Sequence, residues 1–261
     1  MLKTLFKHEM KASSRLLLPL YLVLIVLTIM DRIVLSLDIF SGALAIIPGF
    51  VTFAYILALV AIVVVSFVII VLRFYKNLMS DEGYLMFTLP VKTHELINSK
   101  LIASIIWTIT SIVAIVASLF AVFATPKRID LLLEAIEKAV EGFNDYFGAL
   151  GVLIIIEIII MTVLSLINNA LQIYASIALG QLFNGHKVLG SFAAYIGIST
   201  VMQVVVTVIM IIASVIFKKS FTGIDSIPNI IFPTSIFFLL VSNIAYYYIT
   251  NYMFKKKLNL E

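Results

Sequence analysis

Six long apolar stretches, separated by short polar segments, dominate the pattern of this chain. Each has the roughly 20 apolar residues that a helix needs to cross about 30 Å of hydrocarbon. In lipid, a spanning segment must satisfy its own backbone hydrogen bonds, and apolar runs of this length favour helices over strands. The sequence therefore predicts six transmembrane helices, over residues 16–37, 49–72, 99–123, 149–179, 190–217 and 233–254.

The first 15 residues carry a helical pattern of their own. Apolar residues recur on one face and lysines on another, which is typical of a helix lying at the membrane interface. Glu9 interrupts the apolar face, and we expect a basic group of residues 73–100, such as Arg73, to face it. The sequence predicts an interfacial helix over 1–15.

A second amphipathic pattern occupies residues 124–148. Pro126 opens it, and an apolar stripe follows with acidic residues elsewhere. We expect an external amphipathic helix that lies on the membrane or caps the bundle. No internal repeat or linker divides the chain, so residues 1–261 are expected to form a single membrane domain.

Composition excludes a soluble protein. Hydrophobic residues make up 62% of the chain and charged residues 12%, against about 45–50% and about 25% in soluble domains. The chain contains no cysteine, which excludes disulfides, thiolate nucleophiles and thiolate metal sites. The net charge of +4 comes from residues at the ends of apolar runs, so it indicates topology and not nucleic-acid binding.

Basic residues predict the orientation of the chain. Twelve of the 18 Lys and Arg residues fall in the N-terminus, in 73–100, at Lys187 and in the C-terminal tail, and these segments share one side of a six-span chain. The positive-inside rule places this side in the cytoplasm. We expect a multi-pass protein of the bacterial plasma membrane with both termini cytoplasmic.

The cytosolic segment 73–98 mixes charged residues with large apolar ones. Ser80 can cap a short helix whose first turn holds Asp81 and Glu82, and Pro90 ends the run. A short helix between two breaks, carrying exposed aromatic residues, is typical of a docking surface.

This segment resembles the type-2 ABC exporter permeases of Gram-positive bacteria. The stretch 80–91 reads Ser-Asp-Glu-Gly-Tyr-Leu-Met-Phe-Thr-Leu-Pro-Val, and the resemblance extends to the six spans, the basic N-terminus, residues 100–107 and the lysine-rich tail. In that family two permeases pair with two cytosolic ATPase subunits, and a coupling helix in the first cytosolic loop contacts the ATPase. Carried over, the resemblance implies that the coupling residues are Asp81, Glu82, Gly83, Tyr84, Phe87, Leu89 and Pro90. The alternative is that these aromatic residues pack against the cytosolic ends of the spans.

The resemblance also implies the partners. This chain would pair with an identical or related permease and with cytosolic ABC ATPase subunits, surrounded by lipid, with ATP and Mg²⁺ bound on the ATPase. Residues 180–187 approach the P-loop spacing, but His186 replaces the phosphate-binding lysine and Lys187 the magnesium-binding hydroxyl. We therefore expect no nucleotide, metal or other cofactor on this chain, and no enzymatic activity of its own.

Several polar residues fall inside the predicted spans. Glu157 begins a stripe that continues at helical spacing through Ser165, Asn168, Gln172 and Ser176. Ionisable groups in lipid are costly and commonly functional, whereas amides and hydroxyls often only tie helices together. The candidates for a translocation path are Arg32, Glu157, Asn168, Gln172, Gln203 and Asn243.

Depth suggests one specific contact among these candidates. Arg32 and Glu157 each lie roughly 10 Å below the external surface, taking 1.5 Å per residue from the ends of their spans. We therefore expect an ion pair between them near the outer end of the path. The alternative is that Glu157 is coupled through protonation to Asp31 nearby.

The favoured function is a permease subunit of an ATP-driven exporter that carries hydrophobic or amphipathic peptides, lipids or drugs. A non-transporting sensor or immunity protein that binds a peptide or lipid remains an alternative. A cation-coupled secondary transporter is another, weakened by the absence of inverted repeats. An intramembrane enzyme lacks support because no His-Glu-x-x-His motif or paired carboxylates occur.

Overall fold

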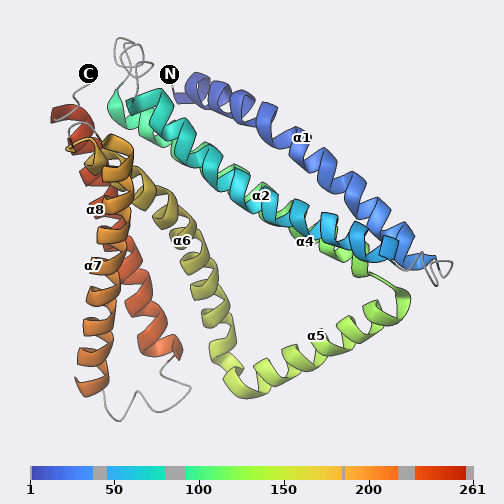
Figure 1. Cartoon of the computed structure of the whole chain (residues 1–261). Helices are drawn as coiled ribbons and strands as arrows, with labels where there is room; N and C mark the ends of the chain where they lie inside the picture. The colour runs from blue at the N-terminus through green and yellow to red at the C-terminus, as the bar shows by residue number, and fades with distance from the viewer. Residues whose placement is uncertain (1, 38–45, 80–91, 184–185, 217–226, 257–261) are drawn as a thin grey trace. The chain divides into compact units, whose positions relative to one another are not determined.

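The computed structural model describes residues 2–37, 46–79, 92–183, 186–216 and 227–256 (Figure 1). Across these ranges the chain forms helices and no strand. Six helices are long and apolar enough to cross a membrane, which confirms an all-α integral membrane protein. These six are α1 Leu2–Ser36, α2 Ile46–Met79, α4 Thr93–Phe123, α6 Gly151–Gly180, α7 Lys187–Ile216 and α8 Phe232–Lys256.

The predicted helix over 1–15 continues without a break into the predicted span that follows it, as helix α1. Buried residues recur every three or four positions along its whole length, so one face packs inward from Glu9 to Asp31. Pro19 lies inside the helix. Prolines are tolerated within membrane helices because neighbouring groups satisfy the freed carbonyl.

Helices α2 and α4 reach beyond their predicted spans. Helix α2 runs to Met79 and α4 begins at Thr93, so both ends of the expected cytosolic segment 73–98 are helical. The amphipathic helix expected over 124–148 is α5 Pro126–Phe147, which begins at the predicted proline and contains no buried residue. A 3₁₀ turn, Gly148–Leu150, joins it to α6.

Helix packing divides the chain into two compact units, a division that the sequence did not suggest. Unit 1 comprises Met1–Leu72 and Asn98–Lys138, and unit 2 comprises Arg73–Ile97 and Ala139–Glu261. Helices α2, α4 and α5 each pass from one unit to the other along their own length.

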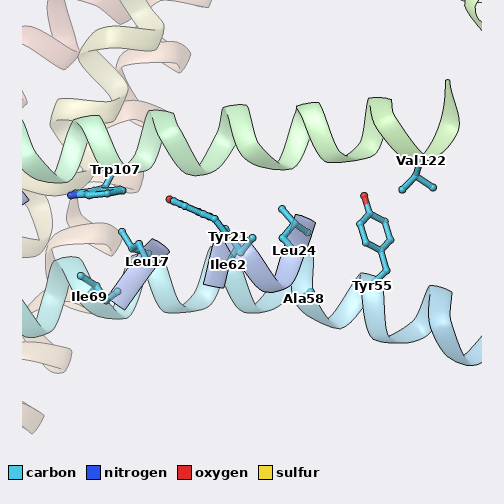
Figure 2. Close-up of a cluster of buried hydrophobic side chains, with 9 residues drawn as sticks. All are labelled: Leu17, Tyr21, Leu24, Tyr55, Ala58, Ile62, Ile69, Trp107 and Val122. Atoms are coloured by element: carbon cyan, nitrogen blue, oxygen red, sulfur yellow. The ribbon is translucent and has the colours of Figure 1, made fainter. Parts of the chain in front are cut away.

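The core of unit 1 is a seam between α1, α2 and α4 (Figure 2). Its members on α1 and α2 recur at steps of three, four or seven, the spacing of a coiled-coil interface. Figure 2 shows Trp107 and Val122 of α4 facing the side chains of α1 and α2, with the hydroxyl of Tyr55 directed towards α4. The buried members are Leu17, Tyr21, Leu24, Tyr55, Ala58, Ile62, Ile69, Trp107 and Val122.

Unit 2 is organised around α6, which packs against both α7 and α8. Gly180, at the end of α6, permits a close approach to α7. A Cβ atom there would lie 2.1 Å from Ser191 Oγ and 2.4 Å from Ser191 N. Small residues allow membrane helices to pack this closely.

Candidate functional site

The proposed coupling residues Asp81, Glu82, Gly83, Tyr84, Phe87, Leu89 and Pro90 lie outside the described residues. The structure describes the helical ends on either side of them. Both ends belong to unit 2, whereas the remaining parts of α2 and α4 belong to unit 1. The backbones of these two helices therefore connect the segment 80–91 to both units.

Three aromatic rings hold the end of α2 within unit 2. Phe74 of α2 stacks on Tyr174 of α6, with ring centroids 3.8 Å apart and planes 8° from parallel. Phe254 of α8 meets Phe74 edge-on at 5.7 Å. All three are buried, and we call them the aromatic joint. Sequence reasoning missed this cluster because nothing in the local spacing of three distant aromatic residues predicts that they meet.

An amide network ties α6 to α8. Asn168 Nδ2 donates to Ser242 Oγ at 2.7 Å and to Asn243 Oδ1 at 3.0 Å. Asn243 Nδ2 in turn donates to the backbone carbonyl of Leu164 at 3.1 Å. Two of the predicted path residues thus meet and share one hydrogen bond, from Asn168 to Asn243.

The next residue of the α6 stripe ties α6 to α7. Gln172 Nε2 donates to Ser199 Oγ at 2.7 Å, and Ser176 Oγ donates to the carbonyl of Gln172. Gln203 lies one turn beyond Ser199 on α7, where its side chain is exposed. Within unit 2, Gln172 therefore contributes to helix packing, while Gln203 faces outward.

Glu157 stands apart from these paired residues. It is half-buried, and its Oε2 atom is buried without a hydrogen-bond partner among the described residues. The other candidates of the α6 stripe, Asn168 and Gln172, donate to side chains of neighbouring helices. Among the described residues of the stripe, Glu157 Oε2 is thus the buried acceptor atom that lacks a hydrogen bond, and it can accept one from a ligand or take up a proton.

Arg32 belongs to a polar layer at one end of the unit 1 seam. Its Nη1 donates to the carbonyl of Val122 on α4 at 2.9 Å. The neighbouring Asp31 is fully buried and accepts a hydrogen bond from Thr52 Oγ1 of α2 at 2.6 Å. The expected Arg32–Glu157 pair would join unit 1 to unit 2 and stays a prediction.

Hydroxyl groups form two further layers in this seam. Ser111 Oγ lies 2.7 Å from the Tyr21 hydroxyl and 2.8 Å from Ser66 Oγ. Ser118 Oγ lies 2.8 Å from both the Tyr55 hydroxyl and Thr28 Oγ1. These layers were not predicted, although serines recur every seven residues along α4, at Ser104, Ser111 and Ser118, and all three are buried.

The buried acid at the other end of unit 1 has a basic partner. Lys100 Nζ lies 2.6 Å from Glu9 Oε1, and both side chains are less than a tenth exposed. The expectation that Glu9 meets a basic group of residues 73–100 is confirmed, with Lys100 in that position. A buried acid of this kind needs such compensation because an unpaired charge in low dielectric is costly.

The described residues show neither a cluster of metal ligands nor the surroundings of a P-loop. No three His, Asp or Glu side chains within the described ranges gather as metal ligands. The P-loop-like stretch joins helix α6, which ends at Gly180, to helix α7, which begins at Lys187, where a true P-loop would follow a strand. None of the protein-family models, curated proteins or solved structures compared with this chain matches it.

Proposed function

We propose that this chain is the permease subunit of an ATP-driven exporter of the type-2 ABC class. Its six spans would form the translocation path together with a second permease, identical or related. Cytosolic ATPase subunits would bind and hydrolyse ATP with Mg²⁺. The proposed setting is a bacterial plasma membrane with both termini in the cytoplasm, as the distribution of basic residues favours.

One observation carries this proposal. The motif at 80–91, which resembles the coupling helix of that family, is flanked by helices whose ends pack in unit 2 and whose membrane portions pack in unit 1. A force applied to this segment by a partner would therefore act on both units through continuous helices. A segment that couples an ATPase to the membrane helices needs such continuous connections to the helices that it is to move.

The residues within the spans favour an apolar or amphipathic cargo. The amides of Asn168, Gln172 and Asn243 are engaged in bonds to neighbouring helices, and the exposed side chains of α6 and α7 are largely apolar. Glu157 adds an acid whose Oε2 atom has no hydrogen-bond partner among the described residues. Peptides, lipids and drugs with apolar surfaces fit such walls. In the apolar window of α7 no residue is buried within the chain, which leaves that helix available to lipid or to a second permease.

Mutation of the segment in a reconstituted complex tests the proposal. Truncating a buried aromatic anchor at an interface commonly costs about 2 kcal/mol or more, equivalent to about 30-fold in affinity. A triple variant should therefore lose most of the substrate-stimulated ATP turnover. It combines Asp81→Lys, Glu82→Lys and Phe87→Ala.

A matched triple substitution on α5 serves as the control. Glu137→Lys, Glu141→Lys and Tyr146→Ala change the same charges and remove one exposed aromatic residue. This variant should retain stimulated turnover. Equal turnover in the wild type and the 81/82/87 variant would contradict the proposal.

A further inference from the structure

Two buried acids on helix α1 are stabilised in different ways. Glu9 is paired with Lys100 at 2.6 Å. Asp31 is fully buried, and its Oδ1 atom accepts a hydrogen bond from Thr52 Oγ1 of α2 at 2.6 Å. Its Oδ2 atom is buried without a hydrogen-bond partner among the described residues. A buried carboxylate needs a compensating positive charge, because an unpaired charge in low dielectric is costly.

The charged group next to Asp31 is directed elsewhere. Arg32 Nη1 donates to the backbone carbonyl of Val122 on α4 at 2.9 Å, and Oδ2 accepts no hydrogen bond from it. The titratable side chain of α2 on which the charge of Asp31 acts is Tyr55. Its hydroxyl lies 2.8 Å from Ser118 Oγ of α4. The described contacts of this layer therefore leave the charge of Asp31 without a bonded cation.

The hydroxyl protons near Asp31 are also committed to other atoms. Each hydroxyl carries a single proton. Thr28, one turn before Asp31 on α1, donates its proton to the carbonyl of Leu24 at 2.6 Å. Ser118 Oγ, 2.8 Å from Thr28 Oγ1, must therefore donate to Thr28, and the Tyr55 hydroxyl must donate to Ser118. The layer keeps oxygen lone pairs that can accept a cation, but it has no proton left for Oδ2.

We propose that Asp31 binds a small monovalent cation, a proton or a sodium ion, at its Oδ2 atom. One carboxylate supplies one negative charge, which one such ion neutralises. A proton bonds directly to Oδ2 and needs no other ligand. A sodium ion needs several oxygen ligands, as hard cations do, and the hydroxyls of this layer are ligands of that kind. Because Thr52 of α2 holds the other carboxylate oxygen, the bound cation stabilises the contact between α1 and α2.

The unfolding temperature of the full chain in detergent tests the inference, with sodium replaced by choline at constant ionic strength. A bound sodium ion should raise the unfolding temperature at fixed pH, by about 5–10 °C at about a hundredfold excess over its dissociation constant. A bound proton should give no response to sodium. The unfolding temperature should then fall as the pH rises, because the folded chain holds a proton that the unfolded chain releases.

Asp31→Asn separates this site from the other acids of the chain. The variant carries a neutral amide of the same size, so it should lose the sodium response, or the part of the pH response that Asp31 causes. Asp145→Asn is the matched control, because Asp145 is exposed on α5, and it should respond as the wild type does. If Asp31→Asn does not fold, Asp31→Ala takes its place, since it also removes the carboxylate.

Two results would overturn the inference. One is a wild-type chain whose unfolding temperature changes neither with sodium nor with pH. The other is a variant without the Asp31 carboxylate that responds to both ions as the wild type does. Neither result bears on the proposed function, because the measurement needs no ATPase partner.

Discussion

At the scale of single residues, unit 1 contains a buried ion pair between two of its helices. Glu9 and Lys100 are both buried and lie 2.6 Å apart. Removing one partner of such a pair leaves the other charge without compensation, which costs far more than the pair itself contributes.

Lys100→Met should therefore destabilise the protein by about 3–5 kcal/mol. Lys138→Met is the matched control, because Lys138 also contacts a glutamate, Glu134, at 2.7 Å, but on the exposed surface of α5. Exposed pairs contribute little to stability. Thermal unfolding in detergent, followed by circular dichroism, would contradict this account if both variants lost equal stability.

The amide network predicts a smaller loss. Asn168→Ala removes both side-chain hydrogen bonds from α6 to α8, and bonds of this kind between membrane helices contribute about 0.6 kcal/mol on average and up to about 1.7. Gln203→Ala, at an exposed position of α7, should change the unfolding temperature little. A larger effect at Gln203 would show that α7 has a partner at this position.

The same residues show what a sequence can and cannot reveal. Helical spacing placed Asn168 and Gln172 on one polar stripe, because spacing fixes the face of a helix. It could not say that Asn168 meets Asn243 or that Lys100 meets Glu9. Those contacts depend on which helices are neighbours, and residues about 75 to 91 positions apart meet only after the bundle has formed.

At the scale of elements, the close contact between α6 and α7 depends on one glycine. Gly180→Ala would place a Cβ atom 2.4 Å from the backbone nitrogen of Ser191, which cannot move aside as a side chain can. Overpacking of this kind costs about 1–3 kcal/mol. Gly180→Ala should lower the unfolding temperature accordingly.

Gly197→Ala on α7 is the control for this prediction. Apart from its chain neighbours and the backbone of its own helix, no atom lies within 4 Å of the position that its Cβ would occupy. Alanine favours helix over glycine by up to about 1 kcal/mol, so this variant should be neutral or slightly more stable. A loss of stability in Gly197→Ala as large as that in Gly180→Ala would contradict the assignment of the loss to the close contact between Gly180 and Ser191.

The spans were the most predictable elements, and their ends the least. Hydrophobic length alone located six helices, but α1, α2 and α4 continue well into segments that the apolar pattern treated as separate. A hydropathy pattern marks where lipid begins and ends. It does not mark the end of a helix, which depends on caps, breakers and packing partners.

At the scale of the whole molecule, the predicted orientation can be tested directly because the chain contains no cysteine. Single cysteines then report accessibility without background. Glu137→Cys on α5 should react with a membrane-impermeant maleimide in intact cells, whereas Ser80→Cys should react only after permeabilisation. The reverse pattern would place the 80–91 segment outside the cell and exclude contact with a cytosolic ATPase.

The division into two units could not be read from the chain. Each unit is assembled from segments far apart in sequence, and α2 and α4 contribute to both. The division matters for the proposed coupling segment because of the two helices that flank it. The ends of α2 and α4 next to the segment belong to unit 2, and the membrane portions of both helices belong to unit 1.

The central claim is that residues 80–91 contact an ATPase subunit and pass its conformational change to this chain. Photo-crosslinking tests this contact most directly. A photoreactive phenylalanine analogue replaces Phe87 in cells that carry the native partners. In a separate control variant the analogue replaces Tyr146, an exposed residue of α5. The account predicts an adduct from position 87, and none from position 146, with a subunit that contains a P-loop and hydrolyses ATP. Adducts from position 87 only with lipid or with this chain itself would contradict it.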